Sequence, residues 1–198
     1  MRFAVFASGN GSNFEAIVRA VENKEISATL VCLFSDKINA YVIERAKKKK
    51  IPYMVIEKEK QETKESYEKK IIEYLEEKSI DFIILAGYMK ILGHVLLEKY
   101  PKKIINLHPS LLPSFPGKQG IHDAFYSKEK ETGITIHLVD QGIDTGPIIF
   151  QHAISITRHE TLSSLETRIH ELEHRYYPIV IEKYIREVVL NDKKKSLN

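Results

Sequence analysis

Cysteine, tryptophan and long apolar runs are scarce or missing in this chain of 198 residues. No apolar run approaches the roughly 20 residues that a helix needs to span a bilayer, so we expect no membrane partner. The single cysteine, Cys32, excludes an intrachain disulfide and fits a reducing compartment, which favours a cytoplasmic location. Because Cys32 lies in an apolar stretch without an evident base, we interpret it as a small buried hydrophobe and not as a nucleophile.

A strong charge of one sign is also lacking, since 30 Lys and Arg residues stand against 27 Asp and Glu residues, for a net charge of +3. Lysines lie beside glutamates along the predicted helices, which is typical of a solvated helix surface. The lysine runs at residues 47–50 and 193–195 are assigned to the end of a helix and to a polar tail of residues 191–198. Neither run is interleaved with aromatic residues, as a groove for single strands would be, so we expect no nucleic-acid partner.

Short apolar runs alternate with amphipathic stretches through the first half of the chain. The runs at residues 3–7, 29–34, 53–56, 82–86 and 104–107 are predicted strands. A stretch ending near residue 22 and the stretches at 40–49, 66–78 and 94–99 are predicted helices. This alternation favours the α/β class, with an open, mostly parallel twisted sheet flanked by helices.

The pattern changes in the second half. Residues 111–120 are predicted to be a loop, and residues 135–139 and 147–156 are predicted to be strands added antiparallel to the sheet. A long helix is predicted from about residue 161, and Pro178 should kink or split it. Its predicted buried stripe consists of Leu162, Leu165, Ile169, Leu172, Tyr176 and Ile179. No linker or repeat interrupts the chain, so residues 1–190 are predicted to form a single domain.

The loop after the first predicted strand, Ser-Gly-Asn-Gly-Ser-Asn at residues 8–13, has the composition of an anion site. Glycines let the backbone approach an anion closely, and the helix that follows offers free N–H groups with a partial positive charge. The loop lacks the third glycine of a dinucleotide fingerprint and the Gly-Lys-Ser/Thr of a P-loop, so a phosphomonoester suits it better. A simple turn with a serine N-cap is the alternative.

Asn106 and His108 come at the end of the fifth predicted strand, where the ligand crevice of an open α/β sheet lies. Because they are two residues apart in an extended segment, their side chains point to the same side. They supply an amide donor and a group that titrates near neutrality, in a loop stiffened by prolines. A structural role is the alternative for His108. We interpret His137 and His170 as structural, although either could approach the site.

The loop at residues 140–147, Asp-Gln-Gly-Ile-Asp-Thr-Gly-Pro, could aim two carboxylates inward. A surface hairpin or a metal loop is the alternative. The loop has too few oxygen ligands for calcium and lacks the terminal Glu of an EF-hand, and no His/Cys pair has the spacing of zinc ligands. We therefore predict that the chain holds no metal.

Together these motifs resemble those of the phosphoribosylglycinamide formyltransferase family. The likeness rests on residues 8–13, Gly-Tyr-Met-Lys-Ile-Leu at 87–92, Asn-Leu-His-Pro-Ser-Leu-Leu-Pro at 106–113, Phe-Pro-Gly at 115–117 and Asp-Thr-Gly-Pro at 144–147. They occur in that family's order and spacing, and the likeness covers nearly the whole chain. The resemblance implies a Rossmann-like formyltransferase fold. It also implies formyl transfer from the co-substrate 10-formyltetrahydrofolate to the amino group of glycinamide ribonucleotide, in purine biosynthesis.

The same resemblance implies roles for single residues. Asn106, His108 and Asp144 would be catalytic, and the ribonucleotide would contact Gly11, Ser12, Asn13 and, at its glycinamide end, Glu173. The folate pocket would be formed by Lys64, Met89, Lys90, Ile91, Leu92, Asn106, Asp140, Gln141, Gly142, Ile143 and Asp144. By pattern alone, Glu173 could be a solvated flank and Lys64 an ordinary surface lysine.

Two single positions and one short stretch depart from the family pattern. Lysine stands at positions 64 and 90, where the family usually has arginine, and lysine lacks the planar fork that binds carboxylates. We expect the contacts of both lysines to be weaker or mediated by water. Residues 118–122 also differ from the better-known members, so their contacts stay open.

The hypothesis for the chemistry is direct attack of the substrate amine on the formyl carbon, without an acyl-enzyme. Asn106 would donate to the developing oxyanion, His108 would stabilise it and act as general acid, and Asp144 would orient His108. The expected partners are small-molecule substrates, and the chain could be a monomer or a homodimer. Alternatives are a methionyl-tRNA formyltransferase or a formyltetrahydrofolate hydrolase, each expected to carry an additional domain for which this chain has no room. A non-catalytic sugar-phosphate sensor is a further alternative.

Overall fold

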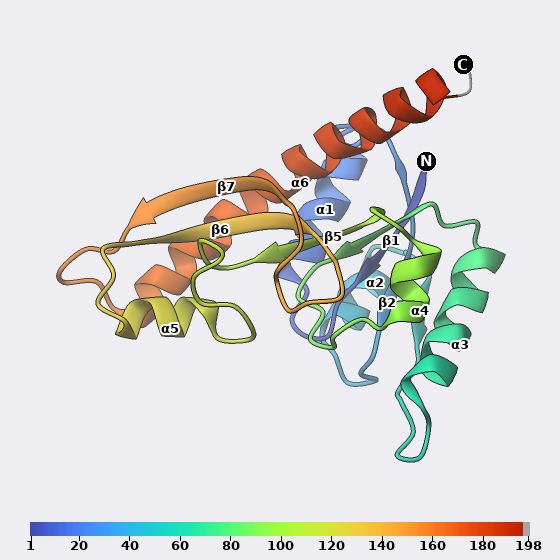
Figure 1. Ribbon diagram of the computed structural model, residues 1–198, viewed down its shortest axis with the longest axis horizontal. Helices are drawn as coiled ribbons and strands as arrows, with labels where there is room; N and C mark the ends of the chain where they lie inside the picture. Colours follow the sequence, from blue (N-terminus) through green and yellow to red (C-terminus); the bar gives the residue numbers. More distant parts are fainter. Residues whose placement is uncertain (196–198) are drawn as a thin grey trace.

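A seven-stranded sheet in the order β3-β2-β1-β4-β5-β6-β7 forms the centre of the molecule (Figure 1). The computed structural model describes residues 1–195, with side chains to residue 188. The strands are β1 (Arg2–Phe6), β2 (Thr29–Ser35), β3 (Tyr53–Val55), β4 (Phe82–Leu85), β5 (Ile104–His108), β6 (Glu131–Leu138) and β7 (Ile148–Ser155). The first five strands run parallel, and β6 and β7 add antiparallel pairs beyond β5. The predicted mixed, mostly parallel sheet is therefore confirmed.

Helices cover both faces of this sheet. The helices are α1 (Ser12–Glu22), α2 (Val42–Lys48), α3 (Lys64–Glu77), α4 (His94–Lys99), α5 (Gly120–Tyr126) and α6 (Leu162–Lys195). On β1, Phe3 and Val5 pack into the core beneath α1, α2 and α6, whereas Ala4 and Phe6 pack into the core beneath α3 and α4. Because central strands such as β4 are covered on both sides, all four of its residues are apolar and buried.

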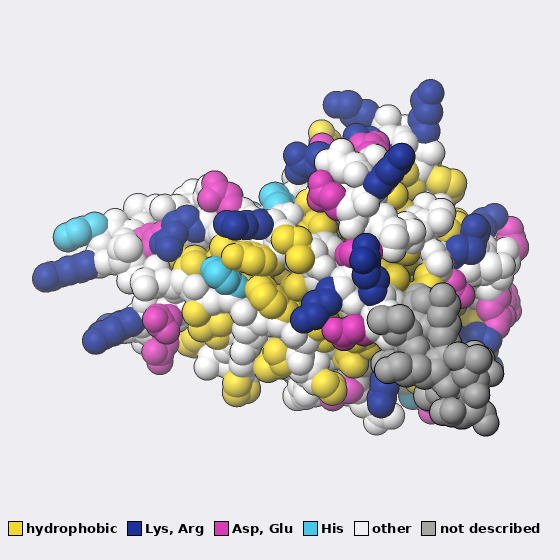
Figure 2. Space-filling view, turned by 90° about the horizontal axis from the view of Figure 1, so that it is seen from above, with side chains coloured by type: hydrophobic (Ala, Val, Ile, Leu, Met, Phe, Trp, Pro, Cys, Tyr) yellow, Lys and Arg dark blue, Asp and Glu magenta, His cyan; other side chains and the backbone are white. Residues whose placement is uncertain are grey.

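The edge strand β7 shows the opposite pattern. Its residues alternate between partly buried and exposed, because one face of this strand meets solvent. Ile148 of β7 and Ile179 of α6 are 49% and 58% exposed. Figure 2 looks down on the side of the molecule where β7 and α6 lie in Figure 1, and apolar side chains gather there between Lys and Arg side chains.

The structure differs from the sequence prediction between residues 120 and 134. α5 was not predicted, and β6 begins at Glu131, four residues before the predicted strand. β6 includes Gly133, although a glycine within a strand usually weakens it. In the sheet it has a packing reason, because a Cβ at this position would lie 2.0 Å from the carbonyl oxygen of His152 on β7.

The long helix α6 runs through Pro178 without being split. Its buried side also differs from the predicted stripe after Leu172. Ile179 is exposed, whereas Tyr177, Val180, Ile181 and Ile185 are among the buried residues of this part of the helix. Tyr177 anchors the helix, since its hydroxyl donates to the carbonyl oxygen of Leu85 at 2.8 Å.

Residues 196–198 of the predicted tail lie outside the described residues, so the division into a domain of residues 1–190 and a tail of residues 191–198 stays a prediction. Among the described helices, none is long and apolar enough to cross a bilayer.

Candidate active site

A cavity of 630 Å³ opens at the carboxyl ends of β1, β4 and β5. Its walls are the loop after β1, the segment after β4, the start of the loop after β5, the segment leading into α5, and the loop between β6 and β7, with α6 on one side. The strand order reverses between β1 and β4, because β2 and β3 continue on one side of β1 and β5 follows on the other. Ligands bind in open α/β sheets at such a switch point.

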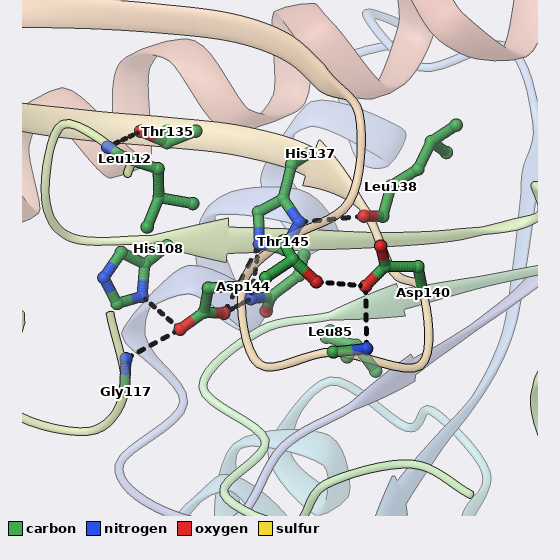
Figure 3. A network of polar contacts seen from close by, with 12 residues as sticks. Leu85, His108, Leu112, Gly117, Thr135, His137, Leu138, Asp140, Asp144 and Thr145 are labelled. Carbon is green, nitrogen blue, oxygen red and sulfur yellow. Dashed lines mark hydrogen bonds and ion pairs between the residues drawn. The ribbon is translucent and has the colours of Figure 1, made fainter. Parts of the chain in front are cut away.

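Asp144 lies at the centre of a polar cluster in this cavity (Figure 3). Its Oδ2 atom is 3.3 Å from Nδ1 of His108 and accepts the backbone N–H of Gly117 at 2.8 Å. Its Oδ1 atom is 3.5 Å from Nε2 of His137 and 3.4 Å from Nδ2 of Asn106. The structure therefore brings together the three residues for which the sequence predicts catalysis.

The carboxylate of Asp144 is held in its charged form. Burial by itself raises the pKa of Asp144, but contact with His137, the N–H of Gly117 and the charge of His108 outweigh burial and hold the pKa below its ordinary value of 3.8. The backbone of Asp144 has a φ of 54°, in the left-handed region that few non-glycine residues adopt. Backbone strain of this kind is concentrated at functional sites.

His108 is buried, and both of its ring nitrogens face oxygen atoms. Nδ1 faces Asp144, and Nε2 donates to the carbonyl oxygen of Phe115 at 2.8 Å. Phe115 also has a positive φ, 56°, which is unusual for a bulky residue. Gly120 packs against the same edge of the ring, since a Cβ there would lie 3.1 Å from Nε2. The loop between β5 and α5 is therefore shaped around this imidazole.

His137 belongs to the same cluster, although the sequence analysis interpreted it as structural. Its Nδ1 donates to the carbonyl oxygen of Leu138 at 2.8 Å, and its Nε2 lies 3.1 Å from Nδ2 of Asn106. His137 on β6 pairs in register with Asn106 on β5. That antiparallel pairing places His137 in the cavity wall, and no local sequence pattern signals it.

The loop after β1 is braced by α2. Gly11 has a φ of 80°, and Val42 packs on it so closely that a Cβ would lie 2.4 Å from Val42 Cγ2. One turn further along α2, Nε and Nη2 of Arg45 donate to the carbonyl oxygen and the Oδ1 atom of Asn10, both at 2.9 Å. The first N–H groups of a helix have no acceptor within the helix, and this end of α1 lines the cavity. The predicted anion loop is thus rigid and opens on the cavity.

Glu173 reaches the cavity from α6 and is only 4% exposed. Its Oε2 atom accepts hydrogen bonds from Nδ2 of Asn13 at 2.9 Å and from Nδ1 of His170 at 2.8 Å. The bond to Glu173 raises the pKa of His170 above its ordinary value of 6.5. Besides this bond, Asn13 can offer an anion its backbone N–H and the second hydrogen of its side-chain amide. The alternative that Glu173 is a solvated flank is wrong.

The residues predicted to bind folate divide into two groups. Those lining the cavity are Met89, Lys90, Ile91, Leu92, Asn106, Asp140, Gly142, Ile143 and Asp144. Lys64, exposed at the start of α3, and Gln141 are not part of the lining. Residues 118–122, whose contacts the sequence left open, also line the cavity. Three of the lining side chains, Met89, Ile91 and Ile143, are large, apolar and about half exposed, and apolar side chains of this kind are typical of the wall of a ligand pocket.

A comparison with known families identifies the family of this chain. The family model described as formyl transferase matches residues 1–181.

The chain belongs to the formyl transferase family.

Similar proteins agree with this membership. A phosphoribosylglycinamide formyltransferase of Bacillus subtilis (strain 168) is 50% identical over 184 residues, which cover 93% of this chain and 94% of that protein. The crystal structure of phosphoribosylglycinamide formyltransferase from Bacillus halodurans has a TM-score of 0.91 at 45% identity, covering 93% of this chain and 95% of that one. Glycinamide ribonucleotide transformylase 1 from Geobacillus kaustophilus has a TM-score of 0.90 at 45% identity, covering 92% and 97%.

The family resemblance and the fold inferred from the motifs are thereby confirmed for this formyl transferase. The roles of individual residues stay predictions, although the geometry brings most of them to one cavity. Among the side chains that the structure describes, no group of three or more His, Cys, Asp or Glu residues is arranged to hold a metal ion. The absence of a metal stays a prediction.

Proposed function

We propose that this enzyme transfers the formyl group of 10-formyltetrahydrofolate to the amino group of glycinamide ribonucleotide, in purine biosynthesis. The observation that carries the proposal is the meeting of Asn106, His108 and Asp144 beside a phosphate-type loop in one cavity. The names of relatives that are 45–50% identical over more than nine-tenths of the chain support it. The folate serves as co-substrate, and we expect no metal requirement.

The two substrates bind against different walls of the cavity. The phosphate of the ribonucleotide binds the backbone N–H groups at the start of α1, where the helix dipole favours an anion. Glu173 accepts hydrogen bonds from the glycinamide end. The folate ring packs against the apolar side chains of Met89, Ile91 and Ile143. Holding both substrates in this way brings the amine within attack distance of the formyl carbon.

The transfer begins when the lone pair of the neutral amine forms a bond to the formyl carbon and the carbonyl electron pair moves onto oxygen. Asn106 supplies a donor to this oxyanion. In the structure, its amide nitrogen contacts His137 at 3.1 Å and Asp144 at 3.4 Å. The longer contact is the weaker one, so the oxyanion takes the place of Asp144 at this donor.

The tetrahedral intermediate collapses when the bond between carbon and the folate N10 breaks. N10 takes up a proton, and the attacking nitrogen releases one. His108 stabilises the oxyanion and delivers the proton, directly or through a water molecule. The Nε2 proton of His108 is hydrogen-bonded to the carbonyl oxygen of Phe115. This hydrogen bond must therefore break, and Nε2 must donate to the substrate or to a water molecule instead. Asp144 keeps the ring oriented during the exchange.

The experiment is a turnover assay that follows release of tetrahydrofolate by absorbance, with and without glycinamide ribonucleotide. Asn106→Ala, which removes the oxyanion donor, should lower kcat about 10²- to 10³-fold. His108→Ala and Asp144→Asn should also lose most of their turnover. His152→Ala and Asp123→Asn are the controls, since neither His152 nor Asp123 lines the cavity.

Two outcomes would contradict the proposal. Release of tetrahydrofolate that does not depend on the ribonucleotide would make the reaction a hydrolysis. Near wild-type turnover in all three site variants, with the fold intact, would remove the catalytic assignment. For the protein as a whole we propose a cytoplasmic location and a monomer or homodimer, which sedimentation of the purified chain distinguishes.

A further inference from the structure

Asp36 is a buried carboxylate that the proposed chemistry does not use. It directly follows β2, and its side chain is 2% exposed. A buried charge is costly unless it is paired and hydrogen-bonded, so its partners indicate what it does. The hydroxyl of Ser8, just beyond the end of β1, donates to Oδ1. The ammonium of Lys90 lies 3.7 Å from Oδ2.

Both partners of Asp36 connect it to the segment of residues 87–92, which forms the folate wall of the cavity. The backbone N–H of Ser8 donates to the carbonyl oxygen of Gly87 at 3.1 Å, and the N–H of Met89 donates to the hydroxyl of Ser8 at 2.9 Å. Lys90 itself belongs to this segment. The wall has no helical or strand hydrogen bonds of its own. The buried side chains of Tyr88 and Leu92 anchor it in the core, and these three ties fix its backbone against the ends of β1 and β2.

The ammonium of Lys90 is occupied by these protein contacts. Besides pairing with Asp36, it lies 4.7 Å from the centre of the Tyr67 ring, as in a cation–π contact. The hydroxyl of Tyr67 in turn donates to the carbonyl oxygen of Ile56 at 2.9 Å, which holds the ring in place. Met89 and Ile91, on either side of Lys90, are about half exposed. The segment thus offers apolar side chains to a ligand, while the ammonium of Lys90 contacts Asp36 and Tyr67 of the protein.

We infer that Asp36 and Lys90 are positioning residues for the folate substrate, because their ion pair fixes the backbone of residues 87–92. This inference rests on the proposed function for the identity of the substrate. It assigns Lys90 a role different from that of an arginine that reaches the folate directly. If the lysine contacted the folate, neutralising Asp36 would release the ammonium and strengthen binding. If the pair positions the wall, the same change weakens binding.

The test variant is Asp36→Asn, which keeps an acceptor for the Ser8 hydroxyl and removes the charge that Lys90 needs. We expect the KM for 10-formyltetrahydrofolate to rise roughly tenfold or more, as misplacement of a binding group does, with the KM for the ribonucleotide unchanged. Lys90→Met should act in the same direction. The double variant should be no worse than the worse single variant, because neither charge is then left unpaired.

Glu160→Gln is the matched control. Glu160 and Arg168 form an ion pair at 2.7 Å whose side chains are 2% and 36% exposed, the same values as for Asp36 and Lys90. Glu160 does not line the cavity. Its replacement should lower stability to a similar degree and leave both KM values unchanged. A folate KM that rises equally in Glu160→Gln would overturn the inference, since general loss of stability would then be the cause.

Hydrogen exchange gives a readout that needs no turnover. In the protein measured without substrates, Asp36→Asn should speed exchange of the Met89 amide, because the ammonium of the neighbouring Lys90 is no longer held by a carboxylate. Unchanged exchange at Met89, or a folate KM that stays the same or falls, would overturn the inference. Absence of turnover in the wild-type enzyme would instead remove the proposed function, and the exchange measurement would still decide about Asp36.

Discussion

Replacing Gly11 by alanine should destabilise the fold and distort the phosphate end of the cavity. Gly11 has a φ of 80°, and a Cβ built on it would lie 2.4 Å from Cγ2, 2.6 Å from Cβ and 3.0 Å from Cα of Val42. Two of these three atoms are close to or part of the backbone of α2, so a change of side-chain rotamer cannot relieve the clash. Either the loop or α2 must shift.

The loss of unfolding free energy in Gly11→Ala has two contributions. A left-handed backbone costs a non-glycine residue about 1–2 kcal/mol. Forcing an extra methyl into a packed contact costs about 1–3 kcal/mol. Gly11→Ala should therefore lower the free energy of unfolding by about 2–5 kcal/mol, if the two parts add.

Two other glycines of the cavity distinguish the backbone contribution from the steric contribution. Gly87 has a φ of 75° but nothing within 4 Å of its Cβ position, so Gly87→Ala carries only the backbone cost. Gly9 has neither a positive φ nor a neighbour within 4 Å. Gly9→Ala should leave stability unchanged or raise it by about 0.4–1 kcal/mol, since alanine restricts the unfolded chain.

Urea unfolding at neutral pH measures the three variants against the parent. The expected order of stability is Gly9→Ala, then Gly87→Ala, then Gly11→Ala. The KM for the ribonucleotide should rise in Gly11→Ala, because the N–H groups at the start of α1 are displaced. The reasoning is refuted if Gly11→Ala is as stable as Gly87→Ala, since Val42 would then impose no constraint on the loop.

Three further predictions concern charged side chains. The pKa of Asp144 is below 3.8 in the folded state, so its stabilisation is present above that pH and is lost as the pH falls through the folded value. The stability advantage of the wild type over Asp144→Asn, measured by urea unfolding, should therefore shrink on acidification from pH 6 to about pH 3. The pKa of His170 is raised above 6.5 by Glu173, so its stabilisation is complete below 6.5 and is lost as the pH rises through the folded value. In the same assay the advantage over His170→Gln should be larger at about pH 6 than at about pH 9, and a constant difference would contradict the assignment. Glu68→Ala should lower the free energy of unfolding by about 1–3 kcal/mol in thermal or urea unfolding, because the buried Glu68 carboxylate accepts the N–H of Gly93 at the start of α4. An unchanged midpoint would show that water replaces the carboxylate.

Much of the sheet could be predicted because its signal is local. Each parallel strand is a short apolar run between polar segments, and α4 was predicted with both ends correct. The predictions failed where a local rule met a tertiary constraint. Gly133 lies within β6 although a glycine usually weakens a strand, and Ile179 continues the apolar spacing of α6 but faces solvent. Pro178 predicts a kink or a split in α6, yet the helix continues through it.

Of the site, the sequence supplied the residue types and their positions after strands. It placed Asn106 and His108 at the end of β5, and it placed Asp144 in the loop after β6. It did not signal His137, which reaches the cluster through the register of β5 with β6. It also assigned Lys90 to the folate pocket without indicating that Asp36 holds its ammonium.

The sequence by itself determined the alternation of strands and helices, the rigid glycine loop and the family motifs, because hydrophobic periodicity and turn chemistry act over a few neighbouring residues. Only the tertiary structure decided which polar and charged side chains meet. Asp36 and Lys90 are 54 residues apart in the chain, and Asn13 and Glu173 are 160 apart. Contacts at such separations depend on the order and register of the packed strands, which no single stretch of sequence specifies.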